Sequence, residues 1–251
     1  MGADLRGRQG PDVHQAVVLH SNPPGNPASY GGGYENGIVG SLIIVGIATL
    51  IAVPFGVAAA VAMVEYGGRF TASASFINDV LVGVPTIVTG AFIYSIWVVH
   101  FGFSGLAGSI ALALVMLPLV VRATAEMLRL VPVSLREASA ALGVSRARTI
   151  VSVVLPTATP GIITGLFLAV ARAMGETAPL LLTALGNEEF MQINPTQRMS
   201  TLSLQIFSDA ITGFQAAQSR AWAGALTLIV IVLLFAIGAR LIGRRATITR
   251  S

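Results

Sequence analysis

The sequence predicts an all-α protein, built as a polytopic bundle of membrane-spanning helices. Hydrophobic residues make up 54% of the 251 residues and charged residues only 10%. Mean hydropathy is +0.80, whereas soluble domains carry about 25% charged residues. Five apolar runs reach about 20 residues, the length that crosses a hydrocarbon core about 30 Å thick. Together these observations exclude an ordinary globular domain.

Taken in order, the apolar runs predict spans at residues 37–64, 76–99, 103–127, 160–185 and 221–243. The first run is long enough to tilt in the membrane. Gly161 and Gly165 form a Gly-x-x-x-Gly pair that favours close contact between helices. Four of the runs contain a proline, whose freed carbonyls neighbouring helices or hydroxyl groups can satisfy: Pro54, Pro85, Pro118 and Pro179.

The placement of arginine predicts the orientation of the chain, because positively charged loops stay in the cytoplasm. Among the short loops, arginines follow the first span, lie between the third and fourth, and follow the fifth, against Arg198 and Arg220 on the opposite side. Residues 129–159 and the tail at 246–251 are therefore expected in the cytoplasm. Residues 1–35 are rich in Gly, Pro and Asn and predict an external, largely disordered segment.

Residue types that are missing narrow the possible functions. All fifteen basic residues are arginine, and without lysine the chain has neither a Walker A phosphate loop nor a Schiff-base nucleophile. Cysteine is absent and the three histidines are scattered, so no metal-ligand set is visible. We expect no catalytic residue, no metal and no cofactor. If ATP drives this protein, a separate subunit must hydrolyse it.

Residues 129–159 have the pattern of two short helices. Ser134 stands three residues before Glu137, the spacing of a capping box, with Val133 and Ala138 placed as a hydrophobic staple. The loop therefore predicts a first helix that begins at Ser134.

A glycine and a proline predict where these short helices end. Gly143 favours a turn, because glycine takes the left-handed conformation at little cost. Ser145 can start a second helix that runs toward Val154, and Pro156 removes the amide that would continue it. The sequence thus predicts two short helices set at an angle.

This loop resembles the EAA motif of ABC-importer permeases, in which Glu-Ala-Ala is followed by glycine and then by Ile-x-Leu-Pro. The six residues of this chain that carry the resemblance are Glu137, Ala138, Ser139, Gly143, Leu155 and Pro156. Ser139 replaces an alanine of that motif and Val153 replaces the isoleucine. The resemblance implies a coupling loop at 129–159 that docks in a groove of an ATPase subunit. The alternative is a loop that only connects two spans, with Glu137 as a helix cap.

A second chemical signal is Arg172 and Glu176, four residues apart near the middle of the fourth predicted span. A charge at mid-membrane costs about 2.5 to 3.5 kcal/mol on insertion scales, so the two must pair, face a polar path, or do both. A guanidinium group offers a planar fork of donors that suits an oxyanion. The alternative is an ion pair that only neutralises itself.

The run from Ala171 to Pro179, which includes Thr177, resembles a signature of the phosphate-importer permeases of the Pst system. The stretch 200–245 is closer to their PstA-type subunit than to the PstC-type partner. This resemblance implies a type I ABC importer permease domain at 36–245, with five spans visible of the usual six. It also implies that Arg172, Glu176 and Thr177 line a phosphate path.

The implied partners are a homologous PstC-like permease, an ATPase dimer, an external phosphate-binding protein and the lipid membrane, with no nucleic acid. A permease for sulfate or molybdate is the nearest alternative. A secondary anion transporter would show repeated broken helices. An intramembrane hydrolase would need a Gly-x-Ser-x-Gly element or a paired Ser and His, and the sequence has neither.

Overall fold

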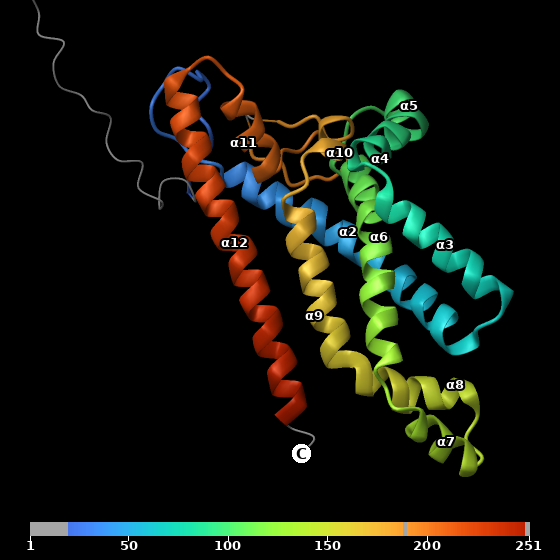
Figure 1. Ribbon diagram of the computed structural model, residues 1–251. Coiled ribbons are helices and arrows are strands. Elements are labelled where there is room, and N and C mark those ends of the chain that lie inside the picture. Colours follow the sequence, from blue (N-terminus) through green and yellow to red (C-terminus); the bar gives the residue numbers. More distant parts are fainter. Residues whose placement is uncertain (1–19, 188–189, 249–251) are drawn as a thin grey trace, which may run out of the picture.

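The computed structural model describes residues 20–187 and 190–248, and all regular secondary structure in these ranges is helical. Four helices within them are long and apolar enough to cross a membrane, and a bent pair makes a fifth span if it is counted as one. The long helices pack in the order α12, α9, α6, α2 (Figure 1). The predicted all-α membrane bundle is confirmed.

Helix α2 (Glu35–Val61) and helix α6 (Gly105–Arg129) form the central contact of the bundle. Ala48 and Ala52 of α2 are fully buried there, against a core that includes Leu112 and Met116 of α6. Small residues let membrane helices approach closely, which replaces the hydrophobic effect as the source of their association. The spans expected at 37–64 and 103–127 are confirmed.

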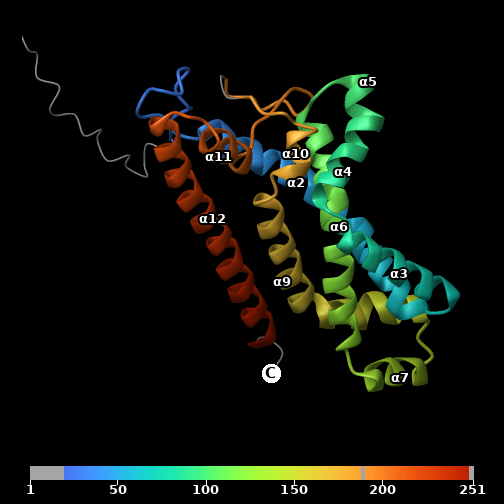
Figure 2. The ribbon, with the colours of Figure 1, turned by 45° about the horizontal axis from the view of Figure 1, so that its top comes forward.

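The second span is not the single helix expected at 76–99. Helix α3 (Arg69–Gly83) and helix α4 (Thr86–Ile93) meet at a bend of 98°. Helix α4 continues through a π-helical turn, Tyr94–Val98, into the short α5, Val99–Phe101. Pro85 lacks an amide and forces the preceding Val84 into an extended conformation, so the helix breaks rather than kinks. Figures 1 and 2 both show α3 and α4 diverging from this point.

The fourth span also differs from the expected range of 160–185. A continuous helix runs from Arg146 to Met174, composed of α8 (Arg146–Thr149), a π-helical turn (Ile150–Val154) and α9 (Leu155–Met174). Pro156 was expected to end the second short helix, but the helix continues through it. It lies within this continuous helix, just after the π-helical turn, where the change of helical hydrogen bonding accommodates the missing amide.

The Gly-x-x-x-Gly pair of α9 packs directly on α6. A Cβ atom on Gly165 would lie 2.7 Å from the Cβ atom of Ala123, and one on Gly161 would collide with Met127. The expected close contact is confirmed. After α9 the chain leaves the helix at Gly175, and α10 (Ala178–Leu181) follows.

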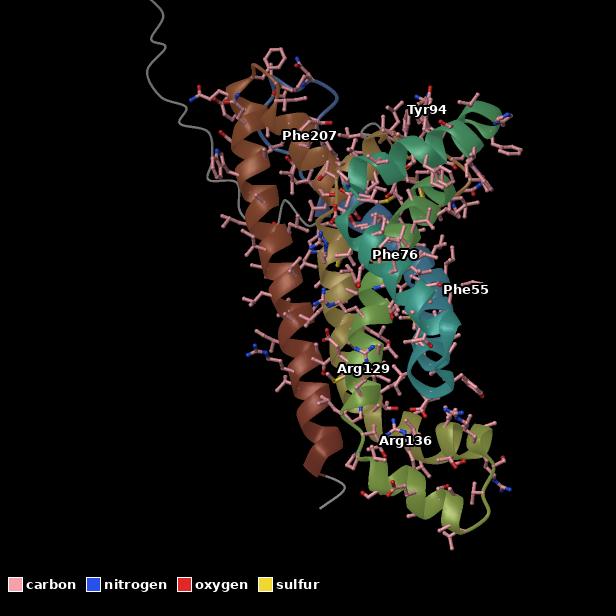
Figure 3. All side chains as sticks on the ribbon, turned by 45° about the vertical axis from the view of Figure 1, so that its right-hand side comes forward. Phe55, Phe76, Tyr94, Arg129, Arg136 and Phe207 are labelled. Carbon is pink, nitrogen blue, oxygen red and sulfur yellow. The ribbon has the colours of Figure 1, made fainter. Side chains whose placement is uncertain are left out.

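The last span is α12 (Gln215–Ile248), which contains the expected span 221–243. It packs against α9 and against α11 (Leu202–Ala210). Phe55 of α2 and Phe76 of α3 are 68% and 69% exposed on the outside of the bundle (Figure 3). Exposed apolar side chains of this kind fit helices whose outer faces contact lipid.

The segment that precedes α2 packs on the bundle. Residues 1–19 of the expected disordered region lie outside the described residues, but residues 20–34 form hydrogen-bonded turns instead. Tyr34 is fully buried, and its hydroxyl donates to Asp209 Oδ2 at 2.6 Å. Arg220 Nη1 donates to the Ser29 carbonyl at 2.7 Å. These contacts with α11 and α12 are formed by residues far apart in sequence, which composition alone does not reveal.

Candidate functional site

Arg172 and Glu176 form an ion pair, with 3.4 Å between Arg172 Nε and Glu176 Oε1. The Arg172 side chain is 60% exposed on this chain and that of Glu176 15%. The sequence placed both residues within one continuous helix, and this expectation is wrong. Helix α9 ends two residues after Arg172, and Glu176 lies outside it. A helix end supplies different surroundings from a helix middle, since the last carbonyls lack helical partners.

The residues after Arg172 are fixed by contacts with other elements. The Glu176 carbonyl accepts from Ser203 Oγ of α11 at 3.2 Å. The Thr177 carbonyl accepts from the Leu180 and Leu181 amides, each at 3.1 Å, and so begins α10. Thr177 thus acts through its backbone in the fold, next to the ion pair.

Arg172 also lines a cavity of about 460 Å³ between α3, α4 and α6. Neither Glu176 nor Thr177 is among the described residues that line it. The structure therefore pairs Arg172 with Glu176 and places Arg172 alone of the three predicted path residues at this cavity.

Residues 129–159, which the sequence predicts as a coupling loop and which keep that name below, contain α7 (Val133–Ala141) followed by α8, with Gly143 between them. Gly143 has φ +73°, the left-handed conformation expected from the sequence. Its amide donates to the Ala140 carbonyl at 2.9 Å, and the Val144 amide donates to the Ser139 carbonyl at 3.1 Å. This pattern is a Schellman motif, which satisfies carbonyls at the end of a helix.

The predicted capping box is wrong. Helix α7 begins at Val133, one residue before Ser134, and no described side chain caps its first turn. Pro132 precedes the helix with φ −56° and ψ 136° and directs the chain into it, so the Ser134 hydroxyl is not needed as a cap. Glu137 is exposed and its carboxylate forms no hydrogen bond or ion pair with the residues that the structure describes, which leaves it available to another molecule.

Ser139, the departure from the EAA pattern, is buried between the two short helices. Its hydroxyl lies 2.7 Å from that of Thr149 in α8. Ala138 and Gly143 are exposed, whereas Leu155 and Pro156 are half-buried at the start of α9. Of the six motif residues, Glu137, Ala138 and Gly143 therefore lie on the surface and Ser139, Leu155 and Pro156 join the loop to the bundle.

Sequence reasoning missed the strongest contact of the coupling loop, which joins Arg136 of α7 to Glu65. The distance from Arg136 Nη2 to Glu65 Oε1 is 2.7 Å, and the side chains are 23% and 6% exposed. Arg136 also donates to the carbonyls of Val131 at 2.7 Å and Leu128 at 3.0 Å. Figure 3 shows Arg136 where α7 meets the bundle. An acidic residue at the end of an apolar run was the only sequence signal.

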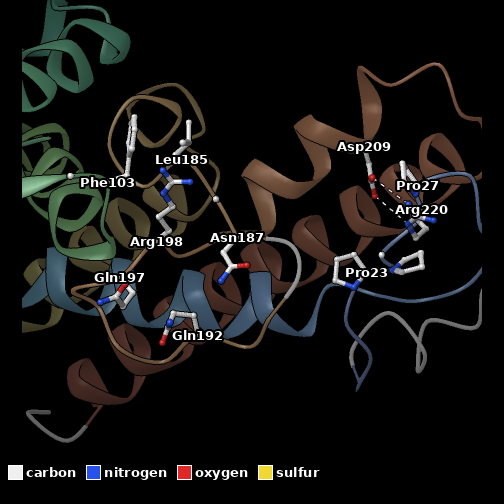
Figure 4. A pocket seen from close by; sticks show the side chains of 14 residues that line it. Pro23, Pro27, Phe103, Leu185, Asn187, Gln192, Gln197, Arg198, Asp209 and Arg220 are labelled. Carbon is white, nitrogen blue, oxygen red and sulfur yellow. Dashed lines mark hydrogen bonds and ion pairs between the residues drawn. The ribbon is translucent and has the colours of Figure 1, made fainter. Parts of the chain in front are cut away.

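A second cavity, of about 820 Å³, is lined by residues of the segment before α2 and of the loop between α10 and α11, among others (Figure 4). Asp209 and Arg220 form a buried ion pair at one side of it, with 3.3 Å between Arg220 Nε and Asp209 Oδ2. Arg198 lies over the ring of Phe103 at 5.4 Å. Arg220, expected in an external loop, is only 2% exposed because it joins α12 to α11.

The coupling loop and the end of α12 lie at one end of the bundle, and α10 and α11 lie at the other (Figures 1 and 2). The long apolar helices, the cavity that Arg172 lines between helices and the short exposed helices at one end fit a multi-pass membrane permease.

Comparisons with known proteins specify the family. The model of the "Binding-protein-dependent transport system inner membrane component" family matches residues 52–248. The phosphate transport system permease protein PstA of Xylella fastidiosa (strain 9a5c) is 44% identical over 218 residues, 85% of this chain and 76% of the relative. PstA of Haemophilus influenzae is 46% identical over 213 residues, 84% and 75% of the two chains. The chain therefore belongs to this family of inner membrane components, as a relative of the PstA permeases.

A solved structure supports the fold. A chain of the inward-facing MetNI methionine ABC transporter superposes with a TM-score of 0.64 and 18% identity, covering 84% of this chain and 93% of that chain. At this identity the match supports the permease fold alone.

Proposed function

We propose that this chain is the transmembrane permease subunit of an ATP-driven importer of inorganic phosphate, and that it forms half of the translocation path. The observation that carries the proposal is Arg172 beside a cavity between helices. Its guanidinium fork suits a tetrahedral oxyanion, and Glu176 holds the fork through Nε. The 44% identity with phosphate permeases supports phosphate as the anion.

A homologous PstC-like permease supplies the other half of the path, and an external phosphate-binding protein delivers the anion. A separate ATPase dimer docks on the coupling loop, which faces the cytoplasm together with the C terminus. In support, Glu137 is exposed, and the apolar side chains of Val133 and Leu142 are 64% and 82% exposed on the same short helices. Exposed apolar residues amid polar ones are typical of a protein-binding surface.

The test is uptake of phosphate by vesicles that contain the complete complex, with sulfate and molybdate measured in parallel. The double variant Arg172→Leu, Glu176→Leu removes both charges and leaves no unpaired partner, so the complex should assemble. It should not transport phosphate. The matched control is Arg122→Leu, Glu126→Leu, an exposed pair at the same spacing in α6, which should transport normally.

Three outcomes are decisive. Normal uptake by the Arg172→Leu, Glu176→Leu variant would remove these residues from the path. Uptake of sulfate or molybdate in place of phosphate by the wild-type complex would change the substrate. Uptake driven without ATP or an ATPase subunit would point to the secondary anion transporter instead.

A further inference from the structure

The cavity beside Arg172 is mostly apolar. Leu81, Val82, Val88, Phe92 and Leu114 line it, and all five are exposed on this chain, so it opens on the surface that they form. Its other apolar walls come from α6 and the bend before α4. Against these walls stand three polar side chains: Thr86, Thr89 and Arg172.

The two threonine hydroxyls have no hydrogen-bond partner among the described residues. Thr49, Thr164 and Thr227 by contrast donate to the carbonyl four residues earlier, although Thr124 of α6 also lacks a partner. For Thr89 that carbonyl belongs to Pro85, which accepts the Val88 amide at 2.9 Å but not the Thr89 hydroxyl. For Thr86 it belongs to Val82, which lies on the other side of the 98° bend.

Both threonine hydroxyls are thus donors that no described acceptor uses, and the break at Pro85 separates Thr86 from the Val82 carbonyl. Arg172 is in a similar state, since within the described ranges its one close contact is through Nε. Its two Nη groups have no acceptor there and remain available as a fork.

Close packing fixes α4 relative to the ion pair. A Cβ atom on Gly90 would lie 2.7 Å from Cα of Pro179, so α4 contacts the backbone of α10 directly. Pro179 follows Glu176 by only three residues. Thr89, the neighbour of Gly90, and Thr86, one turn away, are therefore positioned by the segment that carries Glu176.

We propose that Thr86, Thr89 and the Nη groups of Arg172 form a subsite for a tetrahedral oxyanion. This inference rests on the proposed function, because it identifies donors that the transported phosphate contacts. Hydroxyl and guanidinium donors suit an anion, and the apolar walls strengthen each such hydrogen bond by lowering the local dielectric. The subsite offers few hydrogen-bond donors, so the anion is bound weakly enough to leave, as a transport path requires.

The experiment measures phosphate uptake per assembled complex in vesicles, at saturating phosphate-loaded binding protein. The variant Thr86→Val, Thr89→Val keeps the side-chain shape and removes both hydroxyls. Losing hydrogen bonds to a charged group should lower the uptake rate by about tenfold or more. Thr86→Ser, Thr89→Ser keeps both hydroxyls and should stay within about twofold of wild type. Thr49→Val is the matched control, because that hydroxyl is bonded within α2.

Each result has one meaning. If the wild-type complex imports phosphate and the Thr86→Val, Thr89→Val variant does so at the same rate, the subsite is overturned and the proposed function stays intact. Equal losses in the valine and serine variants would show a packing role and also overturn it. A wild-type complex that imports no oxyanion would defeat the proposed function, which is visible without any variant. Loss of uptake in the Thr86→Val, Thr89→Val variant, with the serine variant unimpaired, supports the subsite, whether the imported anion is phosphate or sulfate.

Discussion

Replacing Arg136 with methionine should loosen α7 from the bundle. The change leaves the Glu65 carboxylate, whose side chain is 6% exposed, without its cation. It also removes the donors to the Val131 and Leu128 carbonyls at the end of α6. Removing one partner of a buried ion pair costs about 3 to 5 kcal/mol. Because Arg136 is 23% exposed and water can reach part of the site, we expect the lower end, about 3 kcal/mol.

Hydrogen exchange of the α7 amides measures this cost directly, since it reports local opening. A loss of about 3 kcal/mol should raise exchange in residues 133–141 by about 100-fold, because each 1.4 kcal/mol is a factor of ten. Exchange in α11, at the opposite end of the bundle, should not change. Arg122→Met is the control, since its exposed pair with Glu126 is worth at most about 0.5 kcal/mol.

The double variant Glu65→Met, Arg136→Met should recover much of the protection, because it leaves no unpaired buried charge. If α7 docks on an ATPase, Arg136→Met should also lower phosphate uptake per ATP hydrolysed. Equal exchange of α7 in the Arg136→Met and Arg122→Met proteins would show that Arg136 is not the anchor, whatever the transport data.

Three further predictions concern other parts of the chain. Gly143→Val should cost about 1–2 kcal/mol, because Gly143 has φ +73° and β-branched residues resist that conformation; uncoupled ATPase activity should follow, and unchanged coupling would contradict a docking role. Ser139→Ala should cost about 1 kcal/mol in exchange protection of α8, because Thr149 loses a partner but keeps its bond to the Ser145 carbonyl. Asp209→Leu should cost about 3 to 5 kcal/mol, since Arg220 is 2% exposed; its thermal midpoint should fall well below that of Arg198→Leu, an exposed control.

Hydropathy and length were enough to predict the long helices, because crossing a membrane requires an unbroken apolar run with internal hydrogen bonds. They could not separate prolines that keep a helix from one that breaks it. Pro54 and Pro118 lie inside α2 and α6, whereas Pro85 stands at a 98° bend. The difference lies in how neighbouring elements pack: α4 is turned to lie against Pro179 of α10, a contact that one sequence does not reveal.

The site was predictable where its chemistry is local. Arg172 and Glu176 are four residues apart, so a local ion pair was expected, and they pair although Glu176 lies beyond the end of α9. Gly143 favours a turn because glycine takes the left-handed conformation at little cost. Contacts between distant residues were not predictable. Glu65 lies 71 residues before Arg136, and in sequence each resembles an ordinary charge at a membrane surface.

The bend at Pro85 connects these two kinds of residue. It interrupts the second span, turns α4 onto the backbone of Pro179 after Arg172, and separates Thr86 from the Val82 carbonyl. In a straight helix over 76–99 the Val82 carbonyl would lie within reach of the Thr86 hydroxyl. The proline that breaks the expected span therefore also leaves the Thr86 hydroxyl available to the oxyanion that we propose beside Arg172.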